Sequence, residues 1–214
     1  MSPLASIFAA GILLAAGEGL AEPLPSSPVC SPIQCDVSAA STPEHLARLQ
    51  TALGRLHAIN PSLAEEASKI QVVLFPQYGV LGGFFDPLNG IVAAREEGGE
   101  CETVSTLAHE LTHARRLGVG PHSLMVSPRQ KTAGEYVAFM LVEEAHAHLA
   151  QVKAARAMNC ADDLPGPDRG FAARIEGKTD AEALEIFLGL TEFTDIYRTE
   201  YTAQFERKRT AVGR

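Results

Sequence analysis

The sequence predicts an α+β fold in which a small antiparallel sheet with a hairpin packs on a mainly helical body. Two patterns lead to this prediction. Short runs rich in β-branched and aromatic residues are confined to positions 70–95, and apolar residues recur at helical spacing on both sides of that region. With 214 residues, the chain is long enough for one domain with a sizeable core.

The first 41 residues are expected to precede this domain. Residues 1–21 contain an apolar run of about ten residues and then small residues suited to cleavage after Ala21, which indicates a secretory signal peptide. A buried N-terminal helix is the alternative, because the apolar run lacks a preceding Lys or Arg; the run is also too short for a membrane span of about 20 residues. Residues 22–41 are rich in Pro and Ser and predict an extended leader, so a single domain is expected over residues 42–214.

The predicted domain begins with a helix and continues into the sheet. Four leucines between positions 46 and 56 follow Pro43 at helical spacing, and Asn60-Pro61 ends this helix. "IQVVLFP", residues 70–76, is a short strand. Two further strand-like segments flank the turn at 86–90, whose Asn-Gly pair favours a hairpin, and an antiparallel sheet is therefore expected.

Helical patterns dominate the rest of the chain. Helices are predicted over about 102–117, where Gly118 ends the pattern, and over about 131–158. The Pro, Gly and Asp content of residues 161–178 predicts a loop. Thr179-Asp180 then caps further helix across residues 181–208.

Charge and cysteine content restrict the partners and the compartment. A formal net charge of −8 and the lack of a basic stripe argue against a nucleic-acid partner. Four cysteines remain after the proposed cleavage, an even number that fits two disulfides and a periplasmic or secreted location, although three pairings are possible. Reduced, buried cysteines are the alternative.

The stretch "TLAHELTHA", residues 106–114, contains the pattern HExxH at His109, Glu110 and His113. Two histidines four residues apart on a helix lie on the same face, so both imidazoles can bind one ion while Glu110 flanks it. A pair of structural histidines is the alternative. The expected ion is Zn²⁺.

A catalytic zinc ion usually has three protein ligands and one position for water, so a third donor is needed. Adjacent residues on a helix point about 100° apart, and at most one of Glu143 and Glu144 can face the ion. We expect Glu144, because His148, four residues later, shares its face and could hydrogen-bond a ligand. His122 is a weaker alternative, and a solvated helix face is the non-functional interpretation of the whole set of candidates, Glu135, Glu143, Glu144, His146 and His148.

These residues resemble the zincin metallopeptidases of the gluzincin branch, in which HExxH on one helix is completed by a Glu on a second helix. The resemblance covers about residues 70–158. The family's ExxxD-like element corresponds here to Glu144-Ala-His-Ala-His148, with His in place of Asp. The third His of the metzincin pattern is absent, since "ARRLGVGPH" follows His113.

The resemblance implies a zincin-like fold and a peptide or protein substrate. Zincins hold an extended substrate on an edge strand beside the metal, and "GGFFDPLNGIVAA", residues 82–94, could provide that strand or be an ordinary core hairpin. No stable membrane insertion is expected after removal of the signal peptide. If the HExxH helix and the Glu144 helix are antiparallel, Cys101 lies close enough to pair with Cys160, which leaves Cys30 to pair with Cys35.

The expected chemistry is hydrolysis by a water bound to zinc on His109, His113 and Glu144, with Glu110 as general base and then acid. A donor for the oxyanion is also expected, and the sequence does not rank the candidates Tyr136, His122, His146 and Tyr197. Three other functions remain open: a zinc-binding pseudoenzyme or interaction module on the same scaffold, a non-peptide amide hydrolase, and a helical interaction protein with an accidental HExxH.

Overall fold

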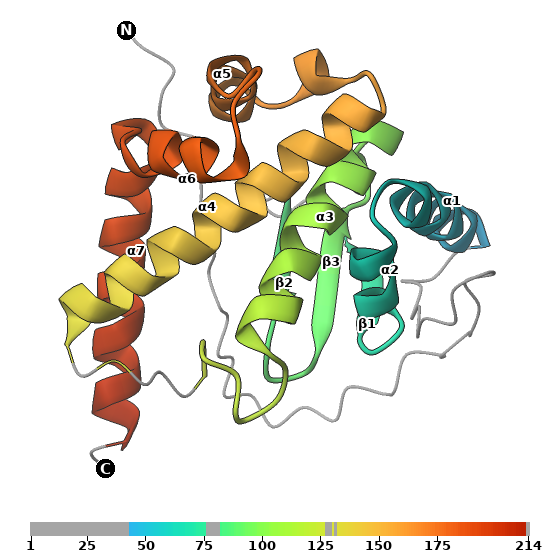
Figure 1. Cartoon of the computed structure of the whole chain (residues 1–214). Coiled ribbons are helices and arrows are strands. Elements are labelled where there is room, and N and C mark those ends of the chain that lie inside the picture. Colours follow the sequence, from blue (N-terminus) through green and yellow to red (C-terminus); the bar gives the residue numbers. More distant parts are fainter. Residues whose placement is uncertain (1–42, 76–81, 127–129, 131, 213–214) are drawn as a thin grey trace, which may run out of the picture.

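A mixed three-stranded sheet lies against a larger helical body in the computed structural model, which describes residues 43–75, 82–126, 130 and 132–212 (Figure 1). The proposed signal peptide, the leader, Cys30 and Cys35 lie outside these residues. The helices and strands follow the chain in the order α1 Pro43–Ile59, α2 Pro61–Ala67, β1 Gln71–Phe75, β2 Gly83–Asp86, β3 Ile91–Arg95, α3 Glu100–Leu117, α4 Ala133–Ala157, η1 Ala161–Asp163, α5 Gly166–Arg174, α6 Asp180–Leu188 and α7 Thr191–Val212.

The sheet has the order β1-β3-β2, with β3 in the centre. The predicted hairpin is present: β2 and β3 are antiparallel, and the Asp86 carboxylate accepts hydrogen bonds from the backbone N–H groups of Leu88 and Asn89 in the turn. The expectation of a purely antiparallel sheet is wrong, because β1 pairs with β3 in parallel. The periodicity of a strand indicates which of its residues are buried. It does not indicate whether a strand that precedes a hairpin pairs with the first or the second strand of that hairpin.

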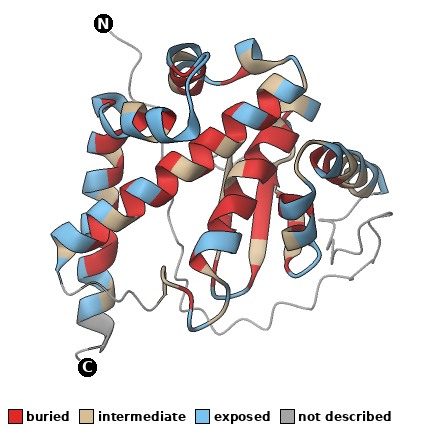
Figure 2. Ribbon diagram, viewed as in Figure 1, coloured by how far each residue is buried: buried red, intermediate tan, exposed pale blue. Residues whose placement is uncertain are grey.

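Helix α3 covers one face of this sheet and is buried along most of its length (Figure 2). Glu100 and Glu102 occupy its first turn, where negative charge is favourable, and Gly118 ends it with a φ of +76° that favours glycine. Val104 and Leu111 are fully buried in the core. The HExxH segment therefore lies in the middle of a helix that cannot rotate without exposing its apolar side chains.

Helix α4 crosses α3 and also packs against α6 and α7 (Figure 1). Its first turn is closed by a capping box, in which Thr132 and Glu135 each accept the other's backbone N–H, so Glu135 serves as a cap. The predicted Cys101–Cys160 disulfide is confirmed. It joins the start of α3 to the residues just after α4, and the two helices are therefore antiparallel.

One prediction for the C-terminal third needs correction. Residues 161–178 do not form a loop throughout, because η1 and α5 lie within them, with Pro167 in the first turn of α5, where a missing N–H has no cost. The prediction of further helix over 181–208, capped at Thr179, is confirmed, and this helical region consists of α6 and α7 with Gly189 between them. None of the described helices is long and apolar enough to cross a membrane.

Candidate metal centre

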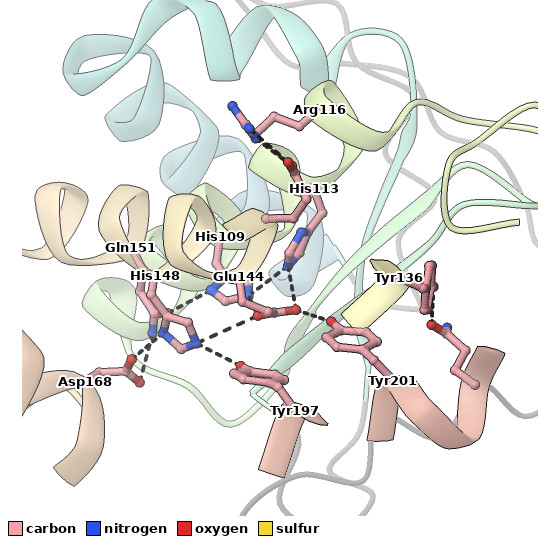
Figure 3. A network of polar contacts seen from close by, with 12 residues as sticks. His109, His113, Arg116, Tyr136, Glu144, His148, Gln151, Asp168, Tyr197 and Tyr201 are labelled. Carbon is pink, nitrogen blue, oxygen red and sulfur yellow. Dashed lines mark hydrogen bonds and ion pairs between the residues drawn. The ribbon is translucent and has the colours of Figure 1, made fainter. Parts of the chain in front are cut away.

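The HExxH histidines project from α3 toward α4 at the centre of the helical body (Figure 3). His109 and His113 lie one helical turn apart, and their Nε2 atoms are 3.2 Å from each other. Their ring planes are inclined by 74°. Both rings therefore direct the same nitrogen atom to one point between α3 and α4.

Glu144 of α4 faces this point. Its Oε1 atom is 3.4 Å from His113 Nε2 and its Oε2 atom is 3.6 Å from His109 Nε2. Glu143, the neighbouring carboxylate, points away and forms a bidentate pair with Arg116, at 2.6 and 2.9 Å. The structure thus brings Glu144, and not Glu143, to the two histidines.

The donor spacing fits a small tetrahedral ion. Zinc–ligand bonds of 2.0–2.2 Å imply donors about 3.4 Å apart at the corners of a tetrahedron. The two imidazole nitrogens are 3.2 Å apart, and each lies 3.4 or 3.6 Å from a different oxygen of the Glu144 carboxylate. Glu144 Oε2 is fully buried and makes no hydrogen bond to the described residues. Because a buried carboxylate oxygen without a hydrogen bond is costly, this atom is suited to binding a cation.

Two overlapping groups of donors in the described residues could hold a metal ion. One is His109, Glu144 and His148, which is largely buried, and the other is His109, Glu110 and His113. In the first group both ring nitrogens of His148 already have partners: Nδ1 lies 2.6 Å from Asp168 Oδ1, and Nε2 lies 2.8 Å from the Tyr197 hydroxyl. His113 Nε2 contacts only the other candidate ligands in these hydrogen bonds and ion pairs, His109 and Glu144.

The charges of the cluster favour a cation. Burial acts to raise the pKa of Glu144, but His113 and His109 outweigh it and hold this pKa well below its usual range. Burial acts to lower the pKa of His109, yet the carboxylates of Glu110 and Glu144 raise it to about 9. Without a metal, a proton on His109 thus partly neutralises the carboxylates around it, and a bound cation would replace that proton.

Glu110 faces a cleft of about 640 Å³ that leads to the cluster from one side. Its lining includes Gly82 and Gly83 at the beginning of β2, Thr106 of α3, and Leu164 and Asp168 from the segment that follows α4. Burial raises the pKa of Glu110, with a smaller opposing effect from the two histidines. A buried carboxylate of raised pKa beside a cleft is a better proton acceptor than an ordinary carboxylate and is suited to general-base chemistry.

The four side chains considered as oxyanion donors differ in where they lie relative to the cluster. Tyr197 hydrogen-bonds His148 and lies next to the cluster, whereas the Tyr136 hydroxyl donates to Gln204 on α7, 2.5 Å away. His146 lines a different pocket, on the side of α3 and α4 formed with α1 and α2. His122 lies exposed in the turn after α3.

Three important side chains are missing from the sequence-based prediction. The Tyr201 hydroxyl donates to Glu144 Oε1, and its ring stacks on that of Tyr197, so α7 closes the cluster on one side (Figure 3). Gln151 and Asp168 hydrogen-bond the cluster histidines. The position of Gln151 seven residues after Glu144 is a helical spacing that could have indicated it, but α5 and α7 carry no comparable signal.

Comparisons with protein-family models, curated proteins and solved structures gave no match for this chain.

Proposed function

We propose that the protein is a zinc-dependent metallopeptidase in which His109, His113 and Glu144 bind Zn²⁺ and Glu110 is the general base. One observation carries this proposal: two imidazole nitrogens on α3 and the two carboxylate oxygens of Glu144 on α4 lie 3.2 to 3.6 Å apart, beside a cleft that Glu110 lines. The helix arrangement and the neighbouring strand β2 also support a zincin-like interpretation of the fold.

The choice of His113 over His148 follows from the partners of each ring. To bind the ion, His148 would have to give up the hydrogen bond between its Nε2 atom and the Tyr197 hydroxyl, whereas His113 Nε2 already points at His109 and Glu144. We therefore assign His148 to the surroundings of the site.

When bound, zinc would supply an activated water and polarise the scissile carbonyl. Glu110 takes the proton of the attacking water and passes it to the leaving amine, a role that its burial and raised pKa support. An extended substrate segment can pair with β2, which is an outer strand of the described sheet and whose Gly83 lines the cleft. A short segment of peptide therefore lies across Glu110 in this proposal.

The test separates metal binding from catalysis. We expect His113→Ala to remove zinc, because His113 is a proposed ligand. Glu110→Gln should keep zinc and abolish peptide cleavage, because Glu110 is the proposed base and does not bind the ion. Zinc content is measured by mass spectrometry after dialysis, and cleavage with a library of fluorogenic peptides. Glu144→Gln, which alters the third proposed ligand, should also lose zinc. Glu143→Gln is its matched control, because it removes the neighbouring carboxylate and should retain zinc.

Each different result of these measurements would favour one of the alternative functions. Equal zinc loss in Glu110→Gln and His113→Ala would contradict the roles assigned here. Stoichiometric zinc without peptide cleavage would indicate a pseudoenzyme or interaction module, and cleavage restricted to small amides would indicate a non-peptide amide hydrolase. Absence of zinc from the wild-type protein would make HExxH accidental.

We also propose a periplasmic or secreted location. The Cys101–Cys160 disulfide hints at an oxidising, extracytoplasmic compartment. With the signal peptide removed, the mature chain should begin at or near Glu22. Intact-mass measurement of protein recovered from the cell envelope or the medium tests this, and an uncleaved chain in the cytoplasm would contradict it.

A further inference from the structure

Two buried polar side chains, Gln151 and Asp168, form a line of hydrogen bonds that connects α5 to His109 (Figure 3). The His109 Nδ1 atom is 3.1 Å from Gln151 Oε1, and Gln151 Nε2 is 3.4 Å from Asp168 Oδ2. The other carboxylate oxygen of Asp168 is 2.6 Å from His148 Nδ1. Gln151 and Asp168 are 8% and 4% exposed, so these contacts are shielded from water.

The direction of each hydrogen bond follows from the chemistry of the groups. An ionised carboxylate only accepts, so Asp168 requires the NH₂ group of Gln151 to point toward it. The carbonyl oxygen of Gln151 must then face His109 and accept a hydrogen bond from the Nδ1–H group. With Nδ1 protonated, the lone pair used for metal binding lies on Nε2, which is the atom that faces Glu144.

We propose that Asp168 is a positioning residue for the metal centre, which fixes the Gln151 amide and through it presents His109 Nε2 to the ion. This inference rests on the proposed zinc site. The same carboxylate holds His148 by its Nδ1 atom, so one residue of α5 sets the orientation of two histidines that come from α3 and α4.

The two HExxH histidines differ in whether their Nδ1 atoms have a hydrogen-bond partner among the described residues. His113 Nδ1 is buried and has no hydrogen-bond partner among the described residues. The line from Asp168 therefore supports the ligand that borders the cleft, His109, and leaves His113 to be held by helix packing and by the ion. Loss of Asp168 should consequently affect His109 more than its neighbour.

The critical substitution is Asp168→Asn, which keeps the shape of the side chain but replaces one acceptor with a donor. If the Asn oxygen stays on His148, its NH₂ group faces Gln151, and the Gln151 amide turns over to offer its oxygen. The Gln151 NH₂ group then faces His109 and favours a proton on Nε2, where the metal should bind. Zinc affinity should fall about 10- to 100-fold.

A second substitution should restore the line. In the double variant Asp168→Asn/Gln151→Glu, the new carboxylate accepts from His109 Nδ1 and from the Asn NH₂ group, so every donor again meets an acceptor. Gln151→Glu alone places two carboxylates in contact and should weaken zinc binding. Asp163→Asn, at an exposed residue of the same cleft, is the matched control and should leave zinc affinity unchanged.

Zinc affinity is measured by competition with a chelator of known affinity, after thermal unfolding has shown that each variant is folded. Weaker binding in Asp168→Asn, with recovery to within about threefold of wild type in the double variant, is the expected result. Wild-type affinity in Asp168→Asn, or a double variant as weak as the single one, would overturn the proposal.

A metal-free measurement distinguishes failure of this inference from failure of the proposed function. In ¹⁵N–¹H spectra of the metal-free protein, the His109 Nδ1 proton should be hydrogen-bonded and exchange slowly with water, and in Asp168→Asn it should lose this hydrogen bond and exchange faster. If wild-type protein bound no zinc but showed this behaviour, the proposed function would fail and the positioning of His109 would stand. An Nδ1 proton unaffected by Asp168→Asn would refute the positioning itself.

Discussion

The disulfide between Cys101 and Cys160 gives the most quantitative prediction for stability. It links residues 59 positions apart, and the intervening chain contains α3 and α4 with all the proposed zinc ligands. Closing a loop of this length lowers the entropy of the unfolded chain by about 14 cal/mol/K, or about 4 kcal/mol at 25 °C, in the chain-entropy treatment. Replacing both cysteines with serine should therefore lower the free energy of unfolding by about 4 kcal/mol.

Urea unfolding of metal-free protein measures this difference directly, because zinc would add its own binding energy to the folded state. The wild-type protein treated with a reductant is the control, since it removes the bond without changing the side chains. Both perturbations should shift the midpoint by the same amount. A loss below about 1 kcal/mol in both would refute the loop-closure reasoning.

Two further predictions concern pH and the wall of the cleft. Burial lowers the pKa of His109, but Glu110 and Glu144 raise it to about 9, above the ordinary value of 6.5. The resulting stabilisation of the metal-free fold is complete below pH 6.5 and is lost as the pH rises through about 9. Because zinc displaces this proton, zinc affinity should rise about tenfold per pH unit between pH 7 and 9 by competition titration, and a flat profile would contradict the proton's location. Gly83→Ala should destabilise the protein by about 1–3 kcal/mol in urea unfolding, since a Cβ there would lie 2.7 Å from the Ala93 carbonyl oxygen and 2.3 Å from the Thr106 methyl group. Gly82→Ala, whose nearest contact is 3.8 Å, is the control, and equal effects of the two would contradict this account.

The part of the site that the sequence predicted depends on local geometry. The face shared by residues four apart on a helix brought His109 and His113 together, and the 100° step between neighbours separated Glu144 from Glu143. The antiparallel arrangement of the two helices then led to the Cys101–Cys160 disulfide, which is confirmed. Helical geometry is sufficient to place residues of one helix relative to each other. Placing α3 relative to α4 needed one assumption, that the two helices are antiparallel.

The parts that the sequence did not predict depend on contacts between distant segments. The parallel pairing of β1 with β3 follows from the side on which β1 joins the hairpin, which periodicity does not specify. Residues 161–178 have the Pro, Gly and Asp content of a loop, yet Pro167 is tolerated in the first turn of α5 and Phe171 is buried in the core. Burial of that apolar side chain overrides the local preference for a loop.

His148 illustrates how helical spacing and contacts between distant segments together determine the role of a residue. Its spacing from Glu144 led to the expectation that it would hydrogen-bond a ligand, as the Asp of the gluzincin pattern does. Instead, its ring stacks on Phe187 and its two nitrogens contact Asp168 and Tyr197. An imidazole at this position cannot accept from His109 while it donates to Asp168 and accepts from Tyr197. The acceptor for His109 is therefore provided by Gln151, almost one helical turn further along α4, whose neutral amide is oriented by a carboxylate from α5. With His at position 148, two further residues, Gln151 and Asp168, are needed to hold His109, and this need accounts for a buried carboxylate on a segment whose sequence resembles a loop.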